Sequence, residues 1–372
     1  MSSFEVFAPG RTELAGNHVD HQGGVVLTAA TAQGMRATCE TSGNGEIRIE
    51  SKGFEPICLN SADALSHPGP RPEERGTSLA LVRGMFDQLV AAGFKPCGIS
   101  MRITSEIASG GGLSSSAAYE LLIGCALREA FEYRGVSTLN EPLPLALAAM
   151  HAEREYFGKP CGCMDQAAIA LGGIQLIDFA NPQQPTAQRI DASFAELGLS
   201  VVLVDTGVTH DDASSQADYA SIPTDMCAVA QALQAQRLGQ LDSHAFEQNA
   251  ATLRIQLGKR PVLRAQHYFD EVELVRKRAE ALQTGDADAF IAATCASGQS
   301  SIEHLQNIGP ALPALERVQA ALPAGSACRI HGGGFGGYIQ AFVPTCSVEQ
   351  FIERVGDCMV IDLTTRCAGV IR

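Results

Sequence analysis

The sequence predicts an α+β protein built of two lobes. Strand-like and helix-like segments mix along the whole chain, which is typical of this fold class. The 372 residues correspond to two or three domains at about 100–200 residues each. Hydrophobic residues make up 45% of the chain and charged residues 18%, so there is enough apolar material for a packed core. We place the lobe boundary near residue 190, with an N-terminal lobe over 1–190 and a C-terminal lobe over 191–372.

The first part of the chain is predicted to form short strands followed by a helix. Turns with glycine separate the strands, which cover Phe4–Phe7, Val25–Ala32, Ala37–Glu40 and Glu46–Glu50. Phe54–Arg75 is rich in Pro, Ser and Glu and is predicted to be a surface loop. Thr77–Ala92 has apolar residues at helical spacing after a threonine, so it is predicted to be an amphipathic helix with Thr77 as its N-cap.

The rest of the chain also mixes strands and helices. Strands are predicted over Gly98–Glu106, Gly173–Phe179, Ser200–Asp205, Arg329–Val343 and Met359–Leu363. Helices are predicted over Ser116–Phe131 and Leu143–Tyr156. From Asp225 to about Gly285 the pattern is mostly helical, with a break near Arg260–Pro261.

Charge and composition exclude several classes of protein. The chain has 27 Lys and Arg against 41 Asp and Glu, a net charge of −14, whereas proteins that bind nucleic acids or membrane surfaces present a basic face. No apolar run reaches the roughly 18 residues of a membrane helix, and the N-terminus lacks the regions of a signal peptide. We therefore expect a cytoplasmic protein whose twelve cysteines are reduced thiols, with Cys161 and Cys163 too weak a motif for a metal site.

The segment from Glu106 to Ala118 has the composition of an anion-binding site. It lies between a predicted strand and a predicted helix, so the helix N-terminus directs unpaired N–H groups toward it. Its glycines let the backbone approach a ligand, and its serines supply hydroxyl groups, one of which could reach a magnesium ion. The plainer alternative is a flexible turn with a serine N-cap. We expect a phosphate site formed by Gly110, Gly111, Gly112, Leu113, Ser114, Ser115 and Ser116.

A second glycine cluster follows His331. Its spacing fits a dinucleotide-binding fingerprint, but a strand-like segment follows where that fingerprint needs a helix. The chain has no P-loop, because neither Gly158-Lys159 nor Gly258-Lys259 precedes Ser or Thr, and it has no G-x-S-x-G motif of a serine hydrolase. We expect a glycine hairpin pressed against a ligand or another loop, formed by Gly332, Gly333, Gly334, Gly336 and Gly337.

The segment from Pro9 to Gly24 concentrates groups that pair with hydroxyls. It is predicted to be a loop between strands, and it carries Arg11, Asn17, His18, Asp20, His21 and Gln22. Carboxylate and amide side chains in such a mix suit the adjacent hydroxyl groups of a sugar. Taken singly, the two histidines would be read as solvated loop residues.

These segments, in this order, resemble the three motifs of the GHMP small-molecule kinases. The segments are PGRTELAGNHVDHQGG, GGGLSSSAA and GGGFGG, and PCGCMDQ at Pro160–Gln166 adds a fourth match. The first and fourth are similar to the signatures of the galactokinases within that family. The resemblance implies two α+β lobes with the active site in the cleft between them. It also implies transfer of a phosphoryl group from ATP, with Mg²⁺, to the C1 hydroxyl of a hexose, D-galactose first.

The resemblance assigns roles to single residues. It implies that Asp165 is the catalytic aspartate, that Arg11 faces it, and that Ser116 or Ser115 holds Mg²⁺ together with Glu153. A low pKa of Asp165 beside Arg11 would make it a weak base, so removing the proton and positioning the hydroxyl both stay open. The sugar-binding residues implied in this way are Asn17, His18, Asp20, Gly162, Asp165 and Tyr219.

The first motif departs from the galactokinase pattern. Galactokinases have Glu-His-Thr-Asp-Tyr-Asn where this chain has Asn17 to Gln22, and the Glu that contacts the hydroxymethyl end of the sugar is Asn17 here. An amide can bond a 6-hydroxyl, but unlike a carboxylate it would not repel a uronic acid, so a galacturonate kinase is an alternative. A non-catalytic sugar sensor and an unrelated glycine-rich nucleotide-binding module are further alternatives. Homoserine and mevalonate kinases are disfavoured, because they lack this sugar loop.

Overall fold

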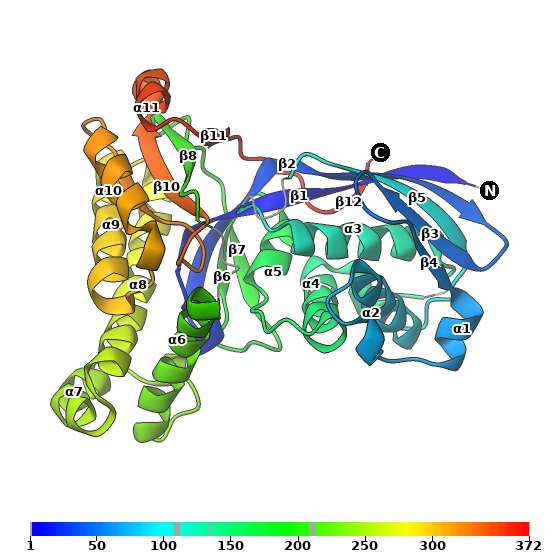
Figure 1. Ribbon diagram of the computed structural model, residues 1–372, viewed down its shortest axis with the longest axis horizontal. Helices are drawn as coiled ribbons and strands as arrows, with labels where there is room; N and C mark the ends of the chain where they lie inside the picture. The colour runs from blue at the N-terminus through cyan, green and yellow to red at the C-terminus, as the bar shows by residue number, and fades with distance from the viewer. Residues whose placement is uncertain (1, 108–111, 134, 209–212, 372) are drawn as a thin grey trace.

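The computed structural model describes residues 2–107, 112–133, 135–208 and 213–371. Two sheets of eight and four strands, each with its own helices, form two lobes at the right and left of Figure 1. This arrangement confirms the predicted α+β fold with two lobes. Within the described part of the chain, none of the helices has the length and apolar character needed to span a bilayer.

The N-terminal lobe is a sheet covered on one face by helices (Figure 1). Strand order is β12-β1-β2-β5-β3-β4, and β6 pairs with β2 and β7. The strands are β1 (Ser3–Ala15), β2 (Val25–Ser42), β3 (Glu46–Ser51), β4 (Ile57–Asn60), β5 (Gly98–Ser105), β6 (Ile174–Asp178), β7 (Thr186–Ile190) and β12 (Gly369–Ile371). The helices are α1 (Ser61–Ser66), α2 (Ser78–Ala91), α3 (Ser115–Ala130), α4 (Pro142–His151) and α5 (Met164–Leu171). Helix α3 packs on β1 and β2, and α2, α4 and α5 pack around α3.

The C-terminal lobe combines a small antiparallel sheet with long helices. Its strand order is β11-β8-β10-β9. The strands are β8 (Leu199–Asp205), β9 (Ala327–Ile330), β10 (Tyr338–Pro344) and β11 (Cys358–Ile361). The helices are α6 (Ala213–Ala232), α7 (Ser243–Leu257), α8 (Lys259–Thr284), α9 (Ala287–Ser300), α10 (Leu312–Ala321) and α11 (Val348–Val355).

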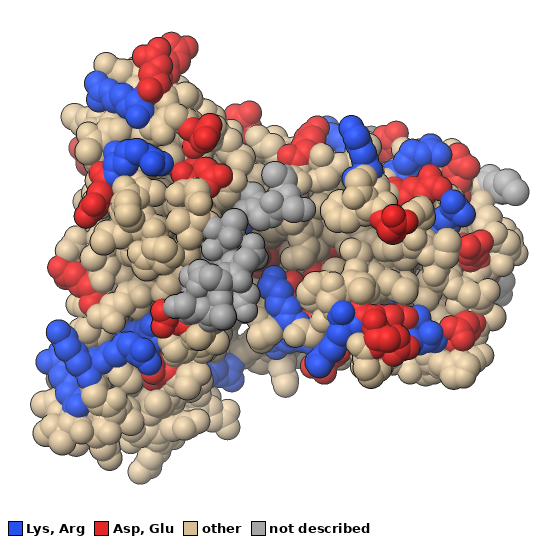
Figure 2. All heavy atoms as spheres, in the orientation of Figure 1, with Lys and Arg blue, Asp and Glu red and all other residues tan. Residues whose placement is uncertain are grey.

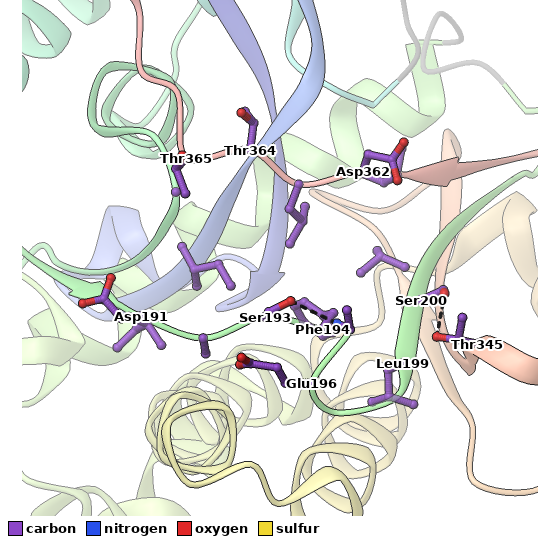
Figure 3. A pocket seen from close by; sticks show the side chains of 18 of the residues that line it. Asp191, Ser193, Phe194, Glu196, Leu199, Ser200, Thr345, Asp362, Thr364 and Thr365 are labelled. Carbon is purple, nitrogen blue, oxygen red and sulfur yellow. Dashed lines mark hydrogen bonds between the residues drawn. The ribbon is translucent and has the colours of Figure 1, made fainter.

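The chain crosses between the lobes twice. The predicted boundary near residue 190 falls in the connection between β7 and β8. A C-terminal lobe over 191–372 is not what the structure forms, however, because β12 returns and pairs with β1, with Glu5 opposite Ile371. A cavity of about 600 Å³ lies at this double crossing and contains none of the sequence-predicted site residues. Figure 3 shows Asp191, Glu196 and Asp362 around it.

The first two strands are longer than their sequence predicts. Strand β1 continues through Pro9 to Ala15, because register shifts after Pro9 and after Glu13 absorb irregularities that would otherwise end it. Strand β2 joins the two strands predicted on either side of Gly34. Gly34 is a packing position, not a turn: a Cβ there would collide with the ring of Phe7.

Two other predictions need correction. Phe54–Arg75 is not a plain loop, because it contains β4 and α1, whose N-terminus Asn60 caps by accepting from Ala62 N and Asp63 N. The helix predicted over Leu143–Tyr156 is α4 followed by a π-helical turn at Ala152–Phe157.

The helix predictions for the C-terminal lobe are partly right. The helical stretch after Asp225 is confirmed, but the interruptions fall between α6 and α7 and at Gly258. Pro261 lies in the first turn of α8, where a proline is tolerated because the N–H it lacks would have no partner within the helix.

Buried ion pairs tie β1 and the segment after it to the C-terminal lobe. Arg278 and Glu271 on α8 form a fully buried pair, and the Gly16 N–H donates to Glu271 at 3.0 Å. Arg329 on β9 donates to the Glu13 carboxylate at 2.6 Å. His267 Nε2 donates to the backbone oxygen of Asn17 at 3.0 Å. The segment that carries the first motif is therefore held from the opposite lobe.

Candidate active site

A cavity of about 670 Å³ brings together residues from both lobes. From one lobe it is lined by the β1 residue Arg11, by Asp20 and His21 of a 3₁₀ turn, by the π-helical turn and by the N-terminus of α5. Tyr219 of α6 and the first residues of the glycine hairpin close it from the other lobe. The sequence-predicted residues on its wall are Arg11, His18, Asp20, Glu153, Gly162, Asp165, Tyr219, Gly332 and Gly333.

Asp165 is bonded through both carboxylate oxygens. Arg11 Nε donates to Oδ1 at 2.6 Å, and the Ser114 hydroxyl donates to Oδ2. A second Arg11 nitrogen donates to the backbone oxygen of Gly112 at 2.7 Å. Burial alone would raise the pKa of Asp165, but attraction to Arg11 and the bonds from Arg11 and Ser114 outweigh it and lower the pKa. Asp165 is therefore ionised at neutral pH.

Ser114 has a role that the sequence did not reveal. It precedes α3 in a left-handed conformation with φ of 58°, and its hydroxyl does not cap the helix. That hydroxyl instead reaches Asp165, 51 residues further along the chain. A serine before a helix predicts an N-cap, so nothing local in the sequence indicates this contact.

Ser116 and Glu153 meet at the start of α3. The Ser116 hydroxyl donates to Glu153 Oε1 at 3.2 Å, and Lys159 Nζ donates to the same oxygen at 3.0 Å. Gln166 Nε2 donates to Glu153 Oε2 at 2.8 Å and to Glu120 at 3.1 Å. Hydroxyl and carboxylate oxygens suit Mg²⁺, and the ammonium of Lys159 shows that this position accepts a cation. The described residues contain no cluster of three or more His, Cys, Asp or Glu side chains that would hold a metal alone.

Glu120, Lys159 and Gln166 were not predicted as site residues. Burial, followed by repulsion from Glu153, raises the pKa of Glu120 well above its usual value. Glu120 sits on the buried face of α3, where its spacing resembles that of a core residue. Only its proximity to Glu153 in space distinguishes it.

Asp20 and Gly162 form a second polar corner of the cavity. A Cβ on Gly162 would overlap the Asp20 carboxylate, so only glycine leaves room for that side chain. Burial and, more weakly, repulsion from Asp165 raise the pKa of Asp20. His18, at φ of 59°, donates from Nε2 to the backbone oxygen of Gly333 at 2.9 Å, and its ring centre lies 5.1 Å from that of Tyr219.

Asn17 is not among the residues that line the cavity. Its side chain is fully buried, and its Oδ1 accepts from Asn307 Nδ2 at 3.3 Å. Its own Nδ2 has no partner among the described residues. The structure therefore places Asn17 behind the cavity wall, next to the residues that touch the glycine hairpin.

The glycine motifs differ in how much of them is described. Gly110 and Gly111 lie outside the described residues. Gly112 is described, and a Cβ there would lie 3.0 Å from Tyr338 and 3.2 Å from His331. The third motif is the hairpin between β9 and β10, and Cβ atoms on Gly333, Gly334 or Gly336 would collide with Tyr219, Asn307 or Val208. The third motif is thus a glycine hairpin that packs against other segments of the chain.

The cysteines near the site are ordinary buried thiols. Cys163 is buried and Cys161 half-buried, and neither belongs to a group of metal-ligating side chains in the described residues. Burial raises the pKa of Cys163 to about 12, so it stays a thiol at neutral pH. On the face shown in Figure 2, basic and acidic side chains are interspersed.

Comparison with known proteins finds two family signatures in the N-terminal lobe. Residues 80–173 match the GHMP kinases N terminal domain, and residues 2–41 match the galactokinase galactose-binding signature. The galactokinase of Lacticaseibacillus casei is 29% identical over 356 residues, covering 94% of this chain and 88% of the relative. The galactokinase of Bacillus subtilis is 26% identical over 357 residues, covering 94% and 87%.

Solved structures share the whole architecture. The crystal structure of Lactococcus lactis galactokinase complexed with galactose matches 100% of this chain and 95% of its own, with a TM-score of 0.82 at 23% identity. The D-glycero-D-manno-heptose 1-phosphate kinase of Bacteroides thetaiotaomicron matches 100% and 99%, with a TM-score of 0.67 at 17% identity. A mevalonate kinase matches 98% of this chain with a TM-score of 0.66 at 15% identity. At these identities the likeness is one of fold.

Proposed function

Because the chain belongs to the GHMP kinase family, we propose that it transfers the γ-phosphoryl group of ATP to the anomeric hydroxyl of D-galactose. The observation that carries this proposal is a single cavity lined by both the Asp165–Arg11 ion pair and the contact between Asp20 and Gly162. Relatives along nearly the whole chain are galactokinases, which supports galactose as the sugar.

In this proposal Asp165 receives the reacting hydroxyl. Its carboxylate is ionised and held on both oxygens, so it is well placed to orient the C1 hydroxyl toward the phosphoryl group. A lowered pKa makes Asp165 a weak base, which favours orientation over early removal of the proton. Arg11 offsets negative charge on the transferring group, as phosphoryl transfer requires.

The other residues divide between the nucleotide and the sugar. The phosphates of ATP lie against the loop from Gly110 to Ser116, at the N-terminus of α3, where helix N–H groups attract anions. Ser116 and Glu153 hold Mg²⁺, which when bound neutralises the phosphate chain. Asp20 accepts from adjacent sugar hydroxyls, while His18, Gly162 and Tyr219 shape the pocket around them.

Galacturonate is a second candidate substrate because of Asn17. The carboxylate found at this position in galactokinases would repel a uronate, whereas the neutral Asn17 would not, and its Nδ2 is a donor without a partner among the described residues. Asn17 lies behind the wall, so this route needs a small movement of the cavity lining.

The test is ADP release from MgATP by the purified protein with one sugar at a time. D-galactose, D-galacturonate, N-acetylgalactosamine and L-arabinose are compared at matched concentrations. We expect the highest kcat/KM with D-galactose. A higher kcat/KM with galacturonate would change the assigned sugar substrate from galactose to galacturonate, and phosphoryl transfer from ATP would remain the assigned reaction. Absence of turnover with every sugar, together with sugar binding, would replace the enzyme with a sensor.

A further inference from the structure

Lys159 lies on the described wall of the cavity and shares a carboxylate acceptor with Ser116, at the start of α3. We propose that Lys159 is a nucleotide phosphate-binding residue, whose ammonium gives up its contact with Glu153 when Mg²⁺ binds there and moves onto the phosphates of ATP. The proposal rests on the function proposed above, because it takes ATP as the ligand.

The contact between Lys159 and Glu153 is the first argument. Lys159 Nζ and the Ser116 hydroxyl share the same oxygen, Oε1 of Glu153, at 3.0 and 3.2 Å. A metal held by Ser116 and Glu153 would bind that oxygen too. The ammonium and the metal would then repel each other across one carboxylate oxygen, so they cannot both stay there.

The freedom of the Lys159 side chain is the second argument. The Glu153 side chain is only 4% exposed, whereas that of Lys159 is 55% exposed, so the ammonium can leave without being stranded in an apolar interior. The Lys159 backbone is held in place, because its N–H donates to the backbone oxygen of Glu153 at 3.1 Å. A movement of this residue is thus confined to its flexible side chain.

The charge on the cavity wall is the third argument. Its described carboxylates include Asp20, Glu153 and Asp165, in a chain with a net charge of −14, and ATP brings further negative charge. Of the other cations there, Arg11 is bound to Asp165 and Gly112, and Arg154 donates to the backbone oxygen of Cys161. Lys159, released from Glu153, starts beside Ser116, where the phosphates are proposed to lie.

The sequence alone suggested no such role. Lys159 follows a glycine, as the lysine of a P-loop does, but it precedes Pro160 and not Ser or Thr. Its place in the site depends on the π-helical turn Ala152–Phe157, which brings the following residues back onto Glu153.

The first experiment measures binding of MgATP without sugar. Wild type, Lys159→Met, Lys159→Arg and the control Lys95→Met are titrated with ATP in excess Mg²⁺, since Lys95 is an exposed lysine outside the cavity lining. We expect Lys159→Met to raise the Kd at least about tenfold, Lys159→Arg to restore most of the affinity, and Lys95→Met to match wild type. A Kd of Lys159→Met equal to that of wild type would overturn the proposal.

The second experiment measures metal binding to the nucleotide-free protein. Mn²⁺ binding is followed by electron paramagnetic resonance in wild type and Lys159→Met. Because Lys159 competes for Glu153, we expect the variant to bind Mn²⁺ about tenfold more tightly. Unchanged Mn²⁺ affinity would refute the exchange.

Turnover with D-galactose separates this proposal from the proposed function. We expect Lys159→Met to lower kcat about tenfold or more and to leave the KM for the sugar within about twofold. A wild-type protein that binds no ATP and phosphorylates no sugar would reject the proposed function. If wild type binds ATP and phosphorylates the sugar, and Lys159→Met does so equally well, only the proposed role of Lys159 is rejected.

Discussion

Gly162 packs directly against the Asp20 carboxylate, and one added methyl group tests what that contact does. The Gly162 backbone does not adopt a left-handed φ, so Gly162→Ala is compatible with the fold, but its Cβ would displace Asp20. We expect the KM for galactose to rise at least about tenfold with a smaller change in kcat, because a misplaced partner weakens sugar binding. Steady-state kinetics with varied sugar measures both.

Gly43→Ala is the matched control for that substitution. A Cβ on Gly43 has no neighbour within 4 Å and its φ is also not left-handed, so we expect unchanged kinetics. If Gly162→Ala kept a wild-type KM, Asp20 would not be a sugar contact, since its carboxylate cannot stay in place beside the new methyl group.

Asp165→Asn tests the ionised carboxylate while keeping its shape. The amide retains an acceptor for Arg11 but loses the charge and the second acceptor that now bind Arg11 and Ser114. We expect kcat to fall about 10²–10⁴-fold with ATP binding in EDTA preserved. Rapid-quench or coupled assays report the first quantity, and a titration the second. A kcat within a few-fold of wild type would remove Asp165 from the reaction.

The sequence predicted the role of a residue where that residue lies in a family motif, and missed it where the role depends on a contact that no local sequence pattern indicates. Arg11, Asp20, Gly162 and Asp165 lie in motifs that resemble a known family, so their roles could be anticipated and the structure gathers them. The bond from Ser114 to Asp165 and the contact of Lys159 with Glu153 could not be found this way. These contacts depend on a left-handed backbone and on a π-helical turn, and neither has a local signature in the sequence.

At the scale of elements, helix α8 holds the first motif in place through buried charge. Arg278 bonds Glu271 and the backbone oxygen of Leu14, with both side chains fully buried. Arg278→Met would leave Glu271 buried without its partner, so we expect a loss of about 3–5 kcal/mol in the free energy of unfolding, measured in urea. Adding Glu271→Gln removes the stranded charge and is expected to recover part of the loss.

The same helix offers a matched control. Arg276 and Glu273 form an ion pair three residues apart at 2.9 Å, but their side chains are 55% and 64% exposed. We expect Arg276→Met to cost about 0.5 kcal/mol or less. Equal losses for Arg276→Met and Arg278→Met would show that burial of the pair does not matter.

Sequence patterns predicted helices and strands well where apolar residues recur at one regular spacing, helical or alternating. Helices α2 and α3 and strands β5, β6 and β8 lie within about one residue of their predictions. The patterns failed where tertiary contacts override a local signal. Pro9-Gly10 did not end β1 because a bulge accommodates it, and Gly34 did not make a turn because it packs on Phe7. The polar Phe54–Arg75 segment hid a short strand and a capped helix.

At the scale of the whole molecule, buried histidines set how stability depends on pH. Burial lowers the pKa of His18 to about 3 and that of His21 to about 4, and it also lowers the pKa of His267 and of His331. All four lie in or beside the first motif and the glycine hairpin that meets it. In the unfolded chain a histidine titrates near pH 6.5, so the unfolded state takes up protons first as the pH falls.

Because the unfolded state takes up protons first, folding stability falls as the pH falls. The stabilising contribution of each histidine is complete above pH 6.5 and is lost as the pH falls from 6.5 toward its lowered pKa in the folded state, which is about 3 for His18 and about 4 for His21. Each fully buried histidine then contributes a slope of roughly 1.4 kcal/mol per pH unit. We expect the melting temperature to be flat from pH 8 to 7 and to fall steeply between pH 6 and 5. His267→Asn is expected to reduce this slope whatever its effect at pH 7.5, whereas His67→Gln, at an exposed position, is expected to leave it unchanged. If the melting temperature fell equally steeply with pH in wild type and His267→Asn, acid sensitivity would arise from the carboxylates alone. Glu271 is one of these carboxylates: Arg278 lowers its pKa to about 2 against the opposing effect of burial, so it contributes only below about pH 4.5.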